Sequence, residues 1–159
     1  MYKKIIVLFG IVSVLSLMVY LLFSGISKEE QVALDYVTEM YAKKDRDLTK
    51  LMQLTGKKIT KEGLKDIEAY LTIPSAAWIG STDTNDPNRK KVYVYFSPEA
   101  TKSGIIKGVY VEKKGERWLY SGDIGGLDKL PKIPFSHFEK SKEAKSLGVK
   151  DWTKIELKS

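Results

Sequence analysis

The sequence of 159 residues contains no cysteine and only one histidine, His137. Without a thiol the chain cannot form disulfides, carry a lipid-modified cysteine or hold a metal through thiolates. His137 falls in "PFSHFEK", beyond the predicted sheet, where it has no predicted catalytic partner. Acid–base catalysis needs a proton donor or acceptor positioned at the reacting atoms. We therefore predict no metal, no cofactor and no enzymatic activity.

Charged residues are absent from residues 5–27, "IIVLFGIVSVLSLMVYLLFSGIS". At ~1.5 Å per residue these 23 residues reach about 34 Å, enough to cross a hydrocarbon core of about 30 Å. A cleavable secretory signal is the alternative, with Gly25 and Ser27 as small residues before the cleavage point. The unbroken apolar run from Ile5 to Phe23 exceeds the usual signal core of about 7–15 residues. The sequence therefore predicts a retained transmembrane helix over residues 5–26.

Basic residues flank the apolar run unevenly. Lys3 and Lys4 precede it, whereas Lys28 is followed at once by Glu29 and Glu30. Short cytoplasmic flanks are the ones enriched in lysine and arginine. We therefore expect a single-pass protein of the cell membrane, with residues 1–4 cytoplasmic and the folded domain extracytoplasmic. An exported domain without cysteine fits a Gram-positive bacterium.

The formal net charge is +7, with 27 basic and 20 acidic residues. Such an excess is compatible with weak contact with anionic lipid or wall polymer, but a lysine-rich solvated surface is the favoured explanation. The lysines are scattered and are not grouped with stacking aromatic residues, so we expect no nucleic acid partner. The expected partners are the membrane, other envelope proteins or a second copy of the chain.

Helical patterns dominate the first part of the domain. Ser27 and Glu30 form the capping box that begins a helix. An apolar stripe at helical spacing follows, made of Val32, Tyr36, Val37, Met40 and Tyr41. Asp47 is suited to cap a second helix over residues 48–54, which Gly56 would end, and Thr60 a third over residues 61–71, ended by Pro74.

The periodicity then changes to two, which predicts four strands at residues 76–81, 91–97, 104–112 and 117–123. In "KVYVYFS", Val92, Val94 and Phe96 share one face and Tyr93 and Tyr95 the other, so this strand is expected to be central and covered on both sides. The sequence predicts an α+β domain over residues 27–126. Residues 127–159 are expected to form an extended arm with a short helix near 136–146 and a frayed end.

The hairpin "VYVEKKGERWLYSGD", following helices with an aromatic stripe, resembles the closing hairpin of the NTF2-like (cystatin-like or SnoaL-like) superfamily. The resemblance covers residues 27–126 and implies a curved antiparallel sheet with helices packed across one face. Membrane-anchored VirB8-like subunits and the N-terminal domains of some penicillin-binding proteins have a similar layout. In those proteins the module acts mainly as a scaffold. The 159 residues are fewer than in typical VirB8-like proteins and include no transpeptidase domain with its Ser-x-x-Lys motif, so neither name is transferred to this chain.

Three features are candidates for a site. Aromatic side chains numerous enough to line a concave pocket or an interaction face are Tyr36, Trp78, Tyr93, Tyr95, Tyr110, Trp118 and Tyr120. Core packing is the simpler explanation for them. Asp83, Asp86 and Asn88 superficially match a calcium loop, but the Gly and distal Glu of that loop are missing and a turn is favoured. "GDIGG" predicts a bend or bulge at the end of the sheet.

Taken with the resemblance, these features predict a membrane-anchored extracytoplasmic interaction or scaffold module of a bacterial envelope or transfer assembly. A carrier of small molecules or lipids, using a cone-shaped pocket, is the alternative. A cyclase or isomerase of this superfamily would need a buried carboxylate with a partner inside the cone. Asp35, beside Tyr36 on the first helix, falls off the apolar stripe and is expected to be solvated.

Overall fold

The computed structural model describes residues 25–43, 45–65, 67, 74–98 and 104–157. None of the helices within these ranges has the length and apolar character needed to cross a bilayer. Nearly all of the predicted transmembrane helix over residues 5–26 lies outside the described residues. The exception is its end, where Ile26 is 7% exposed and belongs to the core of the folded domain.

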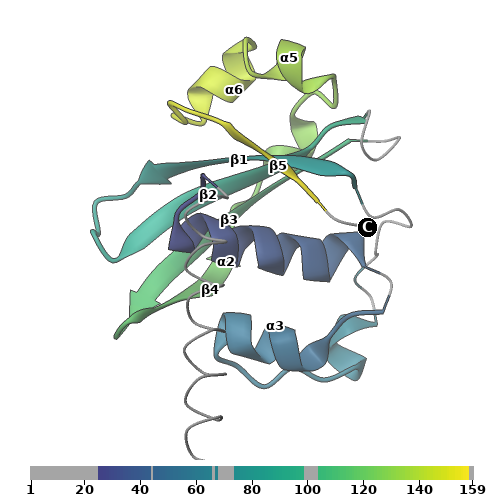
Figure 1. Cartoon of the computed structure of the whole chain (residues 1–159), viewed down its shortest axis with the longest axis vertical. Coiled ribbons are helices and arrows are strands. Elements are labelled where there is room, and N and C mark those ends of the chain that lie inside the picture. Colours follow the sequence, from purple (N-terminus) through teal and green to yellow (C-terminus); the bar gives the residue numbers. More distant parts are fainter. Residues whose placement is uncertain (1–24, 44, 66, 68–73, 99–103, 158–159) are drawn as a thin grey trace, which may run out of the picture.

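The domain is α+β, with one five-stranded antiparallel sheet (Figure 1). The strands are β1 (Ala76–Asp83), β2 (Arg89–Phe96), β3 (Ile105–Lys114), β4 (Arg117–Asp123) and β5 (Thr153–Glu156). Their order across the sheet is β4-β3-β2-β1-β5, so β1 to β4 form a meander and β5 joins the free edge of β1. The prediction of about four strands missed β5, because its four residues are too few to show a clear alternation.

The leading helix begins as the capping box predicts. In α2 (Lys28–Val37) the Ser27 hydroxyl accepts from the Glu30 amide at 3.3 Å, and a Glu30 carboxylate oxygen accepts from the Ser27 amide at 2.9 Å. The chain continues as a π-helix, η1 (Thr38–Ala42). The helix α3 (Leu48–Thr55) is capped by Asp47 and ends at Gly56, whose φ is +65°. Both helix ends of α3 are therefore confirmed.

The third predicted helix, over residues 61–71, is found only in part. Within the described residues it is the short 3-10 helix η2 (Glu62–Leu64), and residues 66 and 68–71 lie outside the described part of the chain. The Thr60 hydroxyl accepts from the Gly63 amide at 3.3 Å, so this threonine caps the turn as predicted.

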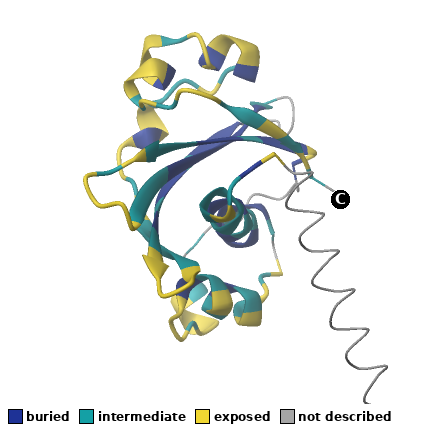
Figure 2. Ribbon diagram, turned by 60° about the vertical axis from the view of Figure 1, so that its left-hand side comes forward, coloured by how far each residue is buried: buried dark blue, intermediate teal, exposed yellow. Residues whose placement is uncertain are grey.

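The sheet carries a cover on each face (Figure 2). On one face α2 lies over the strands. Its buried stripe of Leu34, Tyr36 and Val37, continued by Met40 of η1, packs against Val92, Val94 and Phe96 of β2. On the other face lie Tyr93 and Tyr95, which pack against the segment after β4. The prediction that β2 is covered on both sides is confirmed.

The second cover consists of η3 (Leu127–Lys129), α5 (Phe135–Phe138), α6 (Lys142–Ser146) and the loop that leads to β5. We call residues 124–152 the C-terminal cover. The single helix predicted at 136–146 is wrong, because the chain breaks it at Ser141, whose hydroxyl caps α6 by accepting from the Ala144 amide at 3.0 Å. The frayed end is wrong as well, since β5 pairs with β1 and the Leu157 amide donates to the Ser75 carbonyl at 2.8 Å.

Candidate functional site

The seven aromatic residues predicted as one pocket or interaction face lie on opposite faces of the sheet. Tyr36, Trp118 and Tyr120 lie on the α2 face. Trp78, Tyr93 and Tyr95 lie under the C-terminal cover. Tyr110 stands apart, with the Arg89 guanidinium 4.1 Å from the centre of its ring. The structure therefore does not bring these seven side chains together in one site.

On the α2 face, Tyr36 and Tyr120 stack with ring centroids 3.7 Å apart and an interplanar angle of 17°. Burial, followed by the hydrogen bond with the Tyr120 hydroxyl, raises the pKa of Tyr36 far above its ordinary value. Burial also raises the pKa of Tyr120. Both phenols therefore stay protonated at neutral pH and act as packing and hydrogen-bonding groups.

Under the C-terminal cover the aromatic rings stack directly on one another. Trp78 stacks on Phe135 at 4.8 Å between ring centroids, and Tyr95 stacks on Phe138 at 4.3 Å. The Tyr95 hydroxyl donates to the Ile133 carbonyl and accepts from the Ile133 amide at 3.1 Å. Tyr93 is 4% and Tyr95 0% exposed, so a partner reaches neither side chain unless the cover is displaced.

The acid–base candidates have structural partners. The Asp35 carboxylate accepts from the Lys50 ammonium at 3.0 Å and so ties α2 to α3, where the prediction was a solvated side chain. His137 is exposed on α5. The buried Glu39, 1% exposed, is a residue that the sequence did not point to. It accepts from the Lys43 ammonium at 2.8 Å and from the Asp47 amide at 2.5 Å, which fixes the corner after η1.

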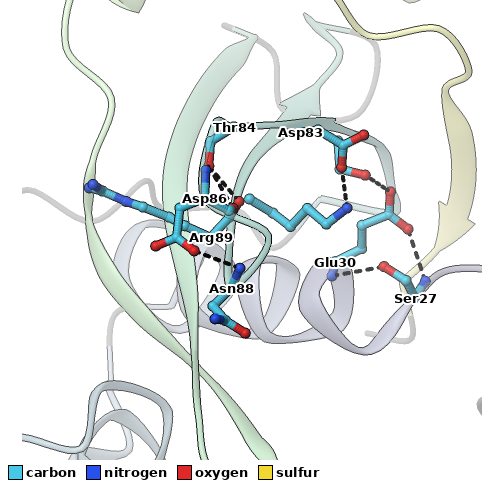
Figure 3. Close-up of polar contacts among 9 residues, drawn as sticks. Ser27, Glu30, Asp83, Thr84, Asp86, Asn88 and Arg89 are labelled. Carbon is cyan, nitrogen blue, oxygen red and sulfur yellow. Dashed lines mark hydrogen bonds and ion pairs between the residues drawn. The ribbon is translucent and has the colours of Figure 1, made fainter.

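The loop that superficially matched a calcium site is a hairpin turn. An Asp86 carboxylate oxygen accepts from the Asn88 amide at 2.8 Å, and the Thr84 hydroxyl donates to the Arg89 carbonyl at 2.8 Å (Figure 3). Asp83 pairs instead with Lys90. Over the described ranges no group of three or more His, Cys, Asp or Glu side chains is placed to hold a metal ion.

The β-bulge lies one residue before the segment "GDIGG", residues 122–126. The register between β3 and β4 shifts next to Tyr110 and Val111, which leaves Ser121 as an extra residue in β4 before Gly122. The Ser121 hydroxyl donates to the Tyr110 carbonyl at 3.3 Å, across the bulge. The prediction of a bend or bulge is confirmed for this end of the sheet, with the bulge at Ser121 and a turn at Gly126, whose φ is +80°.

A polar cleft of about 600 Å³ lies beside the same hairpin, and we call it the α2–β5 cleft. Its charged walls are Glu30 of α2, Asp83 and Lys90 of the β1–β2 hairpin, and Lys150 and Asp151 before β5. Figure 3 shows Glu30 between Ser27 and the hairpin. Its carboxylate accepts from the Ser27 amide at 2.9 Å and from the Ser81 hydroxyl at 2.8 Å, so this side chain is held in place.

The ionic groups of the cleft influence one another across it. The hydrogen bond and the charge of Lys90 lower the pKa of Asp83, and the charge of Lys150 lowers it further. The hydrogen bond that Lys90 donates to Asp83 raises the pKa of Lys90, and the charges of Asp83, Glu29 and Glu30 raise it further. At neutral pH the α2–β5 cleft therefore presents fixed charges of both signs.

No protein-family model, no curated protein and no solved structure matches this chain.

Proposed function

We propose that this chain is a membrane-anchored, extracytoplasmic interaction module with an NTF2-like domain. The apolar run of residues 5–27 supports the anchor, and the basic flank before it supports the orientation. A leading helix that lies across a four-stranded meander closed by the β3–β4 hairpin supports the NTF2-like layout (Figure 1). The strand β5 and the C-terminal cover extend that layout.

The main observation behind the proposal is that almost no linker separates the apolar run from the folded domain. Ile26 packs in the core, and the Ser27 cap of α2 follows directly. Glu30 then binds Ser81 of β1 and fixes the start of the helix to the sheet. If residues 5–24 form the anchor, a domain joined in this way follows it with almost no intervening chain. Confinement in the membrane also raises the effective concentration of partners that associate weakly.

Neither edge of the sheet is suited to bind a partner by adding a strand. The edge strand β5 has only four residues, and its exposed Lys154 and Glu156 form an ion pair. The other edge, β4, contains the bulge at Ser121. Short length, charge and bulges all oppose the addition of a foreign strand. Contacts through loops, helices and the α2–β5 cleft are therefore favoured over extension of the sheet.

Fractionation, protease protection and crosslinking of the full chain in bacterial membranes test the proposal. We expect carbonate-resistant membrane association, a domain that is digested from outside the cell, and a crosslinked complex with an envelope protein or a second copy. A flexible Gly/Ser linker of about ten residues placed between Ser24 and Gly25 should keep the protein in the membrane and weaken the crosslinks. The same linker inserted at the exposed hairpin tip beside Gly115 is the matched control and should leave the crosslinks unchanged.

Release of the mature chain into the medium, trimmed near Ser27, would contradict the anchor. Digestion of the domain only from the cytoplasmic side would contradict the orientation. A small molecule that copurifies with the full chain in native mass spectrometry would favour the carrier alternative over a pure interaction module.

A further inference from the structure

The α2–β5 cleft is assembled from parts of the chain that are far apart in sequence. The helix α2 contributes Glu30, the β1–β2 hairpin Asp83 and Lys90, and the loop before β5 Lys150 and Asp151. The Gly148 backbone, with φ of +76°, turns this loop toward Thr82 of β1. A space of about 600 Å³ with anchored polar walls is large enough for a small polar ligand.

The charges on its walls select the chemistry of the ligand. Two ammonium groups, those of Lys90 and Lys150, face three carboxylates, those of Glu30, Asp83 and Asp151. A purely anionic ligand would meet the carboxylates, and a purely cationic ligand would meet the lysines. Like charges brought together oppose binding, whereas a ligand that carries both signs can pair with both. A zwitterion is therefore the best match.

The position of the cleft identifies the source of such a ligand. Thr153, which lines the cleft, approaches Gly25 so closely that a Cβ atom at Gly25 would lie 3.7 Å from its Cγ2 atom. Gly25 belongs to the uncharged run that begins at Ile5. If that run is the anchor, the cleft lies where the domain meets the lipid headgroups. This step rests on the proposed function.

We propose that the α2–β5 cleft binds a phosphoethanolamine group, the zwitterionic headgroup of a membrane phospholipid. The phosphate pairs with Lys150 and with the ammonium of Lys90 that Asp83 holds in place. The ligand ammonium pairs with the Asp151 carboxylate and lies near the Glu30 carboxylate, whose two oxygens also accept from Ser27 and Ser81. Bound in this way, the headgroup fixes the domain to the bilayer surface at a second point and limits its rotation about the anchor.

The test is a titration of the ¹⁵N-labelled full chain in nonionic detergent with glycerophosphoethanolamine, followed by NMR. We expect amide shifts confined to the residues that line the cleft and their neighbours, at positions 30, 81–83, 90 and 148–153. Lys150→Glu should weaken binding about fivefold, because one surface charge pair contributes up to about 1 kcal/mol. Lys145→Glu is the matched control, since Lys145 is an exposed lysine of α6 outside the cleft, and it should leave binding unchanged.

Separate arms with inorganic phosphate and with ethanolamine distinguish a zwitterion site from a simple ion site. The absence of shifts, equal binding of phosphate alone, or equal weakening by Lys145→Glu would each overturn the proposal. A membrane source requires the same shifts in nanodiscs that contain phosphatidylethanolamine and not in pure phosphatidylcholine discs. Binding of only the soluble probe would overturn the membrane source. Because the detergent titration does not require a membrane-spanning segment, its failure is distinguishable from failure of carbonate-resistant anchoring.

Discussion

The two faces of the sheet are covered by different means. On the α2 face, one amphipathic helix places mainly aliphatic side chains, including Leu34 and Val37, against Val92 and Val94. On the opposite face, short helices of four and five residues are held by stacked rings, with Phe135 on Trp78 and Phe138 on Tyr95. The first cover follows from helical periodicity. The second depends on tertiary contacts, because such short helices are not stable by themselves.

The largest expected loss of stability is that caused by Phe138→Ala. This variant tests whether the two covers of the sheet unfold together. Phe138 is fully buried, and removal of a buried phenylalanine costs about 3–5 kcal/mol of unfolding free energy. We expect a single transition in urea at lower denaturant concentration, because β5 ties the C-terminal cover to β1. His137→Ala, at an exposed position of the same helix, is the control and should have little effect. Tryptophan fluorescence that changes before the far-UV circular dichroism would show that the C-terminal cover detaches alone.

An intermediate effect is expected for Gly80→Ala, which tests how closely the C-terminal cover approaches the sheet. A Cβ atom at Gly80 would lie 2.3 Å from Cγ1 of Val149 and 3.1 Å from the Asp151 carbonyl oxygen. Overpacking of this kind costs about 1–3 kcal/mol. Gly122→Ala is the control, because no atom lies within 4 Å of its added Cβ. Equal urea midpoints for the two variants would mean that the cover yields without strain.

The smallest effect is expected from Tyr36→Phe, which tests the polar contact inside the α2 face. The folded state raises the pKa of Tyr36 above the unfolded value of about 10. The stabilisation of the folded state that comes from protonated Tyr36 is therefore complete below pH 10. As the pH rises above 10 it is lost, and the free energy of unfolding falls by up to about 1.4 kcal/mol per pH unit. Urea unfolding between pH 8 and 11 should show a shallower alkaline loss in the variant than in the wild type. Parallel curves would mean that the Tyr36 hydroxyl ionises equally in both states.

Local signals predicted the parts of the fold that are held by local interactions. The pair Ser27 and Glu30, the cap Asp47 and the stop at Gly56 each act within a few residues, and the structure has all of them. The alternation in β2 likewise indicated a strand that is buried on both sides. These features depend on backbone groups and periodicities that are visible in a short window of sequence.

The C-terminal cover and β5 were missed because their order comes from distant partners. Two signals in the sequence were available: Ser141 as the cap of a helix, and the alternation in "WTKIEL" as a strand. Each spans too few residues to be decisive. The α2–β5 cleft had no local signal, since Glu30, Asp83 and Lys150 meet only when β5 docks against β1. Glu39 has a helical position that looks solvated, and only the corner after η1 buries it.

The position of β5 determines when the nascent chain can complete its sheet. Residues 153–156 are synthesised after the other four strands, yet they complete the sheet beside β1, which starts at Ala76. Until residues 124–152 have emerged and β5 has paired with β1, Trp78, Tyr93 and Tyr95 present an aromatic surface that favours aggregation. A chain truncated before Thr153 should therefore lack the strand that ties the C-terminal cover to β1 and should aggregate more readily.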